Sequence, residues 1–281
     1  MKKIFHFLVY IFALIGLFFT FGYIAIQLHW TDSAGIVDGD QNRYLRNEVV
    51  AALPEPTPEP EIVGHPVDLT WSIVPEWETF KTAVIKDQSV LERVQNETGV
   101  SARLIMAITA SEQLRLYYDN RESYKRAFEP LKILGSESLY SWGVTGIKEF
   151  TAQKVENNLK NPASPFYPGD QYSNLLDFST TDPSTERFNR IVDQHNHYYS
   201  YLYAALYVRE VETQWQNAGF DISDRPEFLA TLYNIGFENS KPNAAPQVGG
   251  AAIKIRNQTY SFGGLSYNIY YSGELLDEFP R

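Results

Sequence analysis

The sequence predicts a mainly α protein: one helical domain with a small C-terminal β-hairpin, preceded by one transmembrane helix. Three observations carry this prediction. Apolar residues recur at helical spacing after Trp71, the period changes from 3.6 to 2 after Gly249-Gly250, and the N-terminus carries a long apolar run. Of the 281 residues, 44% are hydrophobic and 15% aromatic, which is ample for a sizeable core.

The N-terminal apolar run extends from residue 4 to about residue 26. Its roughly 23 residues reach about 34 Å as a helix, against about 30 Å of hydrocarbon in a bilayer. A cleaved signal peptide has a shorter apolar region and a small-residue cleavage site, whereas Gln-Leu-His-Trp follows here. Lys2 and Lys3 before the run, and acids after it, favour a cytoplasmic N-terminus. We therefore expect residues 1–27 to be a single-pass anchor in the cytoplasmic membrane.

A linker is expected between this anchor and the folded domain. Residues 28–66 are polar, and the proline–glutamate run at 53–61 has too few backbone donors for a helix or a sheet. Such a segment is extended, at about 3.1 Å per residue. Residues 67–281 are then the folded domain, placed outside the membrane in the periplasm or cell wall.

Composition and net charge argue against several classes of partner and site. The net charge of -10, from 34 acidic and 24 basic residues, argues against a nucleic-acid partner. The absence of cysteine excludes disulfides and thiolate chemistry. His195 and His197 lie two apart on a predicted helix, where they point away from each other and form no metal pair. We expect neither a metal nor a cofactor.

The domain is expected to be built from a series of helices, delimited by caps, prolines and glycines. Their expected spans are 87–97, 100–116, 121–133, 147–159, 185–218 and 224–236. Loops are expected at 135–146 and 162–172. Near the C-terminus, apolar residues alternate on either side of Asn257-Gln258, which predicts the β-hairpin.

The helix at 100–116 carries a carboxylate within its apolar stripe. Glu112 lies four residues after Ile108 and four before Leu116, so helical packing places it at the edge of the buried face. Burial disfavours the charged form of a carboxyl, which suits a general acid that protonates a leaving oxygen. The alternative is structural: Arg115 is three residues on and could pair with Glu112 in an ordinary helix salt bridge.

Three segments together extend this interpretation: Ala-Ile-Thr-Ala-Ser-Glu ending at Glu112, Ser-Trp-Gly-Val-Thr-Gly starting at Ser141, and Tyr233-Asn234-Ile-Gly236. In this order and at these separations they resemble the lysozyme-like superfamily, in particular the lytic transglycosylases that cleave peptidoglycan. The resemblance covers roughly residues 100–236. Two positions depart from the family pattern: Gln113 replaces the usual serine, and Gly146 occupies the position of the usual glutamine.

The resemblance implies roles for particular residues. Glu112 would be the catalytic acid, and Tyr233 would support it by hydrogen bonding. The residues implied or expected to contact the glycan are Tyr140, Ser141, Trp142, Gly143 and Asn234. For the aromatic residues, among them Tyr198 and Tyr199, ordinary core packing is the alternative to sugar stacking.

The resemblance also implies a reaction and a substrate. No second carboxylate matches a family position, and a retaining or inverting glycosidase normally needs one. The implied reaction is cleavage of the MurNAc-GlcNAc β-1,4 bond, with Glu112 acting first as acid and then as base to give a 1,6-anhydro-muramic end. Two alternatives stay open: a hydrolytic muramidase, and an inactive glycan-binding scaffold that assembles with other cell-wall proteins.

Overall fold

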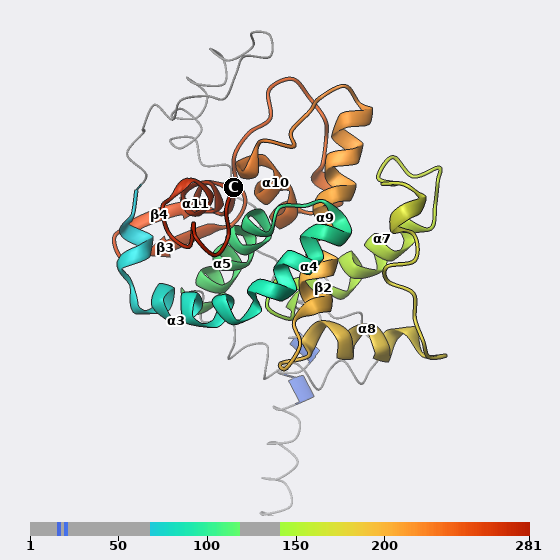
Figure 1. Cartoon of the computed structure of the whole chain (residues 1–281), viewed down its shortest axis with the longest axis horizontal. Coiled ribbons are helices and arrows are strands. Elements are labelled where there is room, and N and C mark those ends of the chain that lie inside the picture. Colours follow the sequence, from blue (N-terminus) through green and yellow to red (C-terminus); the bar gives the residue numbers. More distant parts are fainter. Residues whose placement is uncertain (1–15, 18–19, 22–67, 119–140) are drawn as a thin grey trace, which may run out of the picture.

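A computed structural model describes residues 16–17, 20–21, 68–118 and 141–281 of the chain. The described part of the domain is mainly helical with short antiparallel hairpins, which confirms the mainly α part of the prediction (Figure 1). Its α-helices are α3 (Pro75–Val84), α4 (Gln88–Thr98), α5 (Ala102–Tyr118), α7 (Glu149–Leu159), α8 (Pro183–Val192), α9 (Tyr198–Asn217), α10 (Pro226–Ile235) and α11 (Phe262–Tyr271). Its strands are β1 (Ser141–Trp142), β2 (Ile147–Lys148), β3 (Ala252–Ile255) and β4 (Gln258–Ser261).

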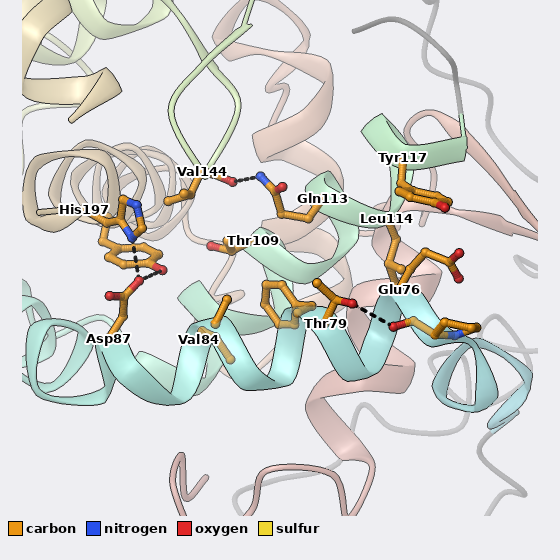
Figure 2. Close-up of a pocket in the computed structure, with 14 residues that line it drawn as sticks. Glu76, Thr79, Val84, Asp87, Thr109, Gln113, Leu114, Tyr117, Val144 and His197 are labelled. Carbon is orange, nitrogen blue, oxygen red and sulfur yellow. Dashed lines mark hydrogen bonds and ion pairs between the residues drawn. The ribbon is translucent and has the colours of Figure 1, made fainter. Parts of the chain in front are cut away.

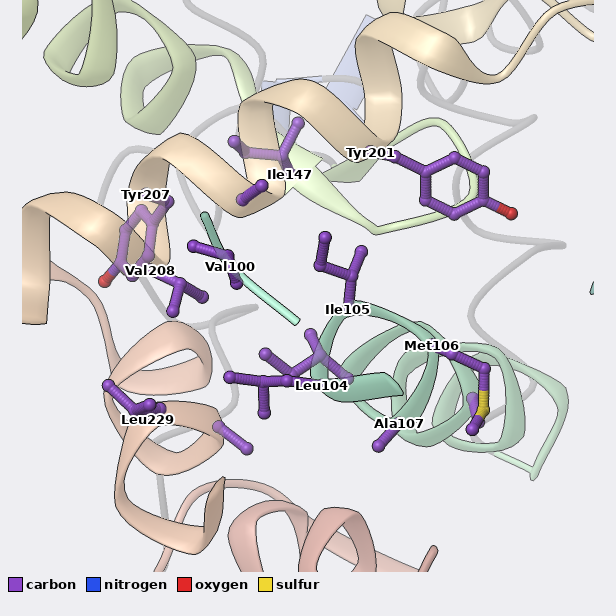
Figure 3. Close-up of a cluster of buried hydrophobic side chains, with 14 of the residues drawn as sticks. Val100, Leu104, Ile105, Met106, Ala107, Ile147, Tyr201, Tyr207, Val208 and Leu229 are labelled. Atoms are coloured by element: carbon purple, nitrogen blue, oxygen red, sulfur yellow. The ribbon is translucent and has the colours of Figure 1, made fainter. Parts of the chain in front are cut away.

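Helix α5 is the central element. It contacts α3, α4, α9, α11 and β3, and its residues from Ala102 to Glu112 are all buried. Figure 3 shows how its apolar side chains lie within the core: Leu104, Ile105, Met106 and Ala107 are surrounded by side chains from α9, α10 and β2. Glu112 therefore lies on a helix that other helices and strands enclose on most sides.

Helices α4 and α5 follow the predicted boundaries closely, whereas α3 was not predicted. Helix α4 ends at Gly99, which adopts the left-handed conformation expected of a C-terminal glycine, with φ of 72°. Helix α5 begins directly afterwards, and the side chain of Gln95 accepts a hydrogen bond from the amide of Ala102 at 2.6 Å. This contact satisfies one of the free amides of the first turn of α5.

The prediction of one continuous helix at residues 185–218 is wrong. The expected span 185–218 is two helices, α8 and α9, separated at residues 193–197. The Asp193 carboxylate accepts hydrogen bonds from the amides of His195 and Asn196, and the Asn196 side chain accepts one from the amide of Tyr198. These local bonds compete with the helical ladder and break it. His195 and His197 therefore lie in a turn, not on a helix.

The C-terminal region contains the predicted hairpin and a helix that was not predicted. Strands β3 and β4 pair in antiparallel register, with Ile255 opposite Gln258. The chain then enters α11, which packs against α10. A Cβ on Gly263 would lie 2.1 Å from the Thr231 hydroxyl and 2.5 Å from the Glu227 carbonyl. Glycine at 263 thus permits the close approach of α11 to α10. The same Gly263-Gly264 pair disfavours a helix, so the sequence did not indicate α11.

Several predictions fall on residues that the structure does not describe. The expected helix 121–133 and the linker 28–66 lie outside the described residues, as does the expected membrane anchor apart from residues 16–17 and 20–21. Within the described residues, we find no helix long and apolar enough to cross a bilayer.

His197 links the start of α9 to the N-terminal helices and makes stability depend on pH. Its Nδ1 lies 2.7 Å from the Asp87 carboxylate, which also accepts a hydrogen bond from Tyr201 at 2.8 Å. The bond to Asp87 raises the pKa of His197 against the effect of burial, and the charges of Asp87 and Asp193 add to it. Burial acts to raise the pKa of Asp87, but the bonds from His197 and Tyr201 and the charges of His197 and Lys86 lower it overall.

We therefore expect the contribution of this pair to the free energy of unfolding to be largest between about pH 4 and 6.5. It is lost as pH rises through the raised pKa of His197, and again as pH falls through the lowered pKa of Asp87. Urea unfolding of the wild type and His197→Gln at pH 5.5 and 8.5 tests this, because the difference between them should shrink at the higher pH. His195→Gln, a change at an exposed histidine in the same turn, is the control. A difference that is equal at both pH values would contradict the assignment.

Candidate active site around Glu112

Glu112 is buried and paired. Its side chain is 3% exposed and that of Arg115 is 6% exposed. Arg115 Nε donates to Oε2 at 3.0 Å and Nη2 donates to Oε1 at 2.6 Å, which is a two-point pair between planar groups. The salt bridge that the spacing allowed is therefore present, but it is buried rather than at the helix surface.

The loop between β1 and β2 lies directly against this carboxylate. A Cβ on Gly146 would come within 2.1 Å of Glu112 Oε1, and Gly146 has a φ of +66°. Both facts require glycine, the first because no side chain fits and the second because other residues are strained there. The glycine in the position of the family's glutamine is thus explained by the close approach of Glu112.

The second departure from the family pattern has a structural role in the same place. Gln113 Nε2 donates to the carbonyl of Val144 at 2.5 Å. A serine side chain is too short to make an equivalent contact from this position. Gln113 therefore ties α5 to the loop that Gly146 ends, and the two departures act together to hold this loop against Glu112.

Tyr233 reaches the same loop from α10. Its hydroxyl donates to the carbonyl of Thr145 at 2.9 Å, and its ring packs edge-on against Tyr207 at 5.1 Å. Burial raises the pKa of Tyr233 well above its usual value, and the charge of Glu112 contributes to this shift. The hydrogen bond expected from Tyr233 to Glu112 is thus made to the backbone of the neighbouring loop. A catalytic role for Tyr233 stays a prediction.

The residues expected to contact the glycan are placed as follows. The Asn234 side-chain oxygen accepts a hydrogen bond from the amide of Ala251 at 2.7 Å, so it holds the backbone before β3. Gly143 has a φ of +65°, and a Cβ there would lie 2.3 Å from the Ile191 carbonyl. Ser141 and Trp142 form β1, but their side chains lie outside what the structure describes, as does Tyr140. Their contacts with a glycan stay predictions.

Thr145 was missed by the sequence analysis. It is completely buried, its amide donates to the hydroxyl of Ser200 at 3.3 Å, and the two hydroxyls lie 3.1 Å apart. It thus fixes the loop to α9, and its carbonyl receives Tyr233. The only signal in the sequence was its place between the two glycines of the Ser-Trp-Gly-Val-Thr-Gly segment.

The three segments singled out from the sequence therefore meet at one carboxylate. Glu112, the loop ending at Gly146, and Tyr233 come from α5, the β1–β2 hairpin and α10. Across residues 68–118 and 141–281, no group of three or more histidines, aspartates or glutamates is placed to hold a metal ion.

Comparison of the chain with protein-family models, with curated proteins and with solved structures finds no match in any of the three.

Replacing Gly146 by alanine should disturb this site strongly. The left-handed backbone costs a non-glycine residue about 1–2 kcal/mol, and the added Cβ must in addition displace the Glu112 carboxylate. We expect the free energy of unfolding to fall by about 2–4 kcal/mol in urea titrations, within the range of overpacked sites. Gly219→Ala is a matched control, since Gly219 has a φ of +85° and nothing within 4 Å of an added Cβ. Equal losses in the two variants would show that Gly146 does not press on Glu112.

Proposed function

We propose that this chain is a lytic transglycosylase with a lysozyme-like domain, which cleaves peptidoglycan glycan strands outside the cytoplasmic membrane. The observation that carries the proposal is the meeting of three segments at Glu112. Gly146, 34 residues further on, abuts its carboxylate, and Tyr233 binds the carbonyl of the adjacent Thr145. These are the segments in which the resemblance to the family lies. If their similarity to the family motifs were due to chance, there would be no reason for them to lie together in the fold.

In the proposed reaction Glu112 acts twice. As an acid it gives its proton to the glycosidic oxygen while the bond from C1 of the muramic acid to that oxygen breaks. As a carboxylate it then takes the proton from the C6 hydroxyl, whose oxygen bonds to C1. The product is a 1,6-anhydro end, Glu112 regains its proton, and water is not consumed. One carboxylate therefore suffices.

Arg115 has a definite place in this cycle. Its guanidinium holds both oxygens of Glu112 by two charge-assisted hydrogen bonds, and the carboxylate is the form that acts as the base in the second step. For the first step one of these bonds must open so that Glu112 can hold a proton. Glycan binding next to the loop at 143–146 would have to supply the free energy for that opening.

The same ion pair favours a second candidate function. A buried, two-point pair is also what a purely structural glutamate would make, and a domain of this kind could bind glycan strands as an inactive scaffold. Such a scaffold would hold strands for other cell-wall proteins. The two functions differ in whether the wild type releases products.

Mass spectrometry of the material released from purified peptidoglycan sacculi tests the proposal. Anhydro-muropeptides are expected from the wild-type chain. Release of muropeptides with reducing ends would replace the transglycosylase by a hydrolytic muramidase. Binding to sacculi in sedimentation assays without any release would replace it by the scaffold.

A further inference from the structure

A cavity of about 320 Å³ lies on the side of α5 that carries Thr109 and Gln113 (Figure 2). Helix α3, the loop at Val144 and the start of α9 complete its wall. Figure 2 shows Asp87 and His197 at one end of the cavity and Glu76 and Tyr117 at the opposite end. Between these polar ends the wall is apolar, and its side chains include Phe80, Val84, Leu114 and Val144.

The side chains around this cavity have hydrogen-bond donors that are already engaged. Thr79 and Thr109 donate to the carbonyls of Pro75 and Ile105 in their own helices. The other bonds of this kind join Gln113 Nε2 to Val144, Tyr201 and His197 to Asp87, and Tyr117 to Glu76. Among the side chains of the described lining residues, one amide hydrogen of Gln113 is left as the donor that a ligand would meet when His197 is neutral.

Acceptors, in contrast, are plentiful and charged. The pKa of Glu76 is lowered, chiefly by a bond to its own backbone amide, and that of Asp87 is lowered by His197 and Tyr201 against the effect of burial. Both carboxylates are therefore ionised at neutral pH. Whether His197 is neutral or protonated, the lining side chains keep a net negative charge, while Lys86 acts on Asp87 and Arg256 on Glu76 from outside the lining. An anion, or a ligand with acceptors alone, would leave these groups unpaired at a cost in free energy.

We propose that this cavity binds a primary ammonium group carried on a short apolar chain. The ammonium group supplies three donors to an acceptor-rich wall, and the chain covers the apolar surface between the two ends. Free alkyl amines and the amino side chain of a peptide share this chemistry. The inference does not depend on Glu112 being catalytic, because Glu112 is not among the residues that line the cavity.

Calorimetric titration of the full-length chain at pH 8.5 with cadaverine, n-hexylamine, n-hexanol and hexanoate tests this inference. We expect both amines to bind at least about tenfold more tightly than the alcohol, as one hydrogen bond to a charged partner allows, and hexanoate to bind least. Equal affinity for hexylamine and hexanol would overturn the proposal. Nα-acetyl-lysine methylamide separates the two sources, since only a site for peptide side chains should bind it as tightly as cadaverine.

Variants locate the binding. Glu76→Gln removes one charge at the partly exposed end of the cavity and should weaken amine binding severalfold. Glu92→Gln removes the same charge from an exposed position on α4, outside the cavity, and should leave binding unchanged. Ala83→Phe places a ring at an exposed lining position and should abolish binding of every probe. Equal weakening by Glu76→Gln and Glu92→Gln would show a general charge effect and contradict the assigned site.

Discussion

Glu112→Gln is expected to reduce the release of anhydro-muropeptides from sacculi by about 10²- to 10⁴-fold, the usual contribution of general acid–base catalysis. The amide keeps the size of the side chain but cannot donate and recover a proton at the glycosidic bond. The rate of product release, followed by mass spectrometry, is the measurement. A variant that releases these products at the wild-type rate would remove Glu112 from the reaction.

The ion pair makes the same substitution costly for stability. In the structure the removal of the Glu112 carboxylate breaks a buried two-point ion pair with Arg115, and breaking such a pair from one side costs up to about 3–5 kcal/mol. The remaining amide oxygen can keep one of the two bonds, so we expect a loss of about 1–3 kcal/mol in the free energy of unfolding.

A double variant separates the two effects. Glu112→Gln with Arg115→Met removes both members of this ion pair, so any recovery of stability relative to the single variant should come without a recovery of product release. Glu97→Gln is the control, because Glu97 forms a more exposed pair with Arg93 on the neighbouring helix. If product release recovers together with stability, the loss in Glu112→Gln reflects folding and not chemistry.

Arg103→Met is expected to produce the largest loss of stability of any substitution considered. Arg103 is completely buried, and its guanidinium donates to six backbone carbonyls at the end of α11 and in the segment that follows it. Burial lowers its pKa to about 10, so it stays charged at neutral pH. Methionine fills similar space but can donate none of these bonds. The carbonyls of Ile269 and Leu275 keep a second donor, the Ser272 hydroxyl and the Phe279 amide, while the other four lose the guanidinium.

Each buried carbonyl left unpaired costs about 1–3 kcal/mol, although some of those near the C-terminus can turn to water. We expect a total loss above about 4 kcal/mol in urea unfolding, together with faster proteolysis after residue 269. Arg103→Lys should lose less but still substantially, because one ammonium group cannot reach all of the carbonyls. Arg93→Met, at an exposed arginine, should change stability by less than about 1 kcal/mol. A similar small loss for Arg103→Met would show that the C-terminal segment does not depend on this residue.

Some of this protein follows from the sequence by itself, because the signals are local. Glycine in the left-handed conformation ends α4 at Gly99, and a proline begins α10 at Pro226. The alternation around Asn257 predicts the β3–β4 hairpin. Helical periodicity also predicts that Glu112 lies on a buried helix. Each of these features depends on residues within a few positions of one another. The sequence therefore indicates them directly, and tertiary packing agrees with the local conformational preference.

Other features were decided by the tertiary structure, because the partners are distant in sequence. Side chains in the turn at 193–197 replace the helical ladder between α8 and α9, and His197 bonds to Asp87, 110 residues earlier. Helix α11 forms against α10 through a pair of glycines that disfavour an isolated helix. Compared with the family motif, Gly146 is a departure from the usual glutamine. In the structure glycine is required at this position, because the Glu112 carboxylate, 34 residues away in sequence, leaves no room for a side chain. Whether a charged side chain is buried and paired depends on the elements that pack around it. Hydrophobic periodicity along one helix does not identify those elements.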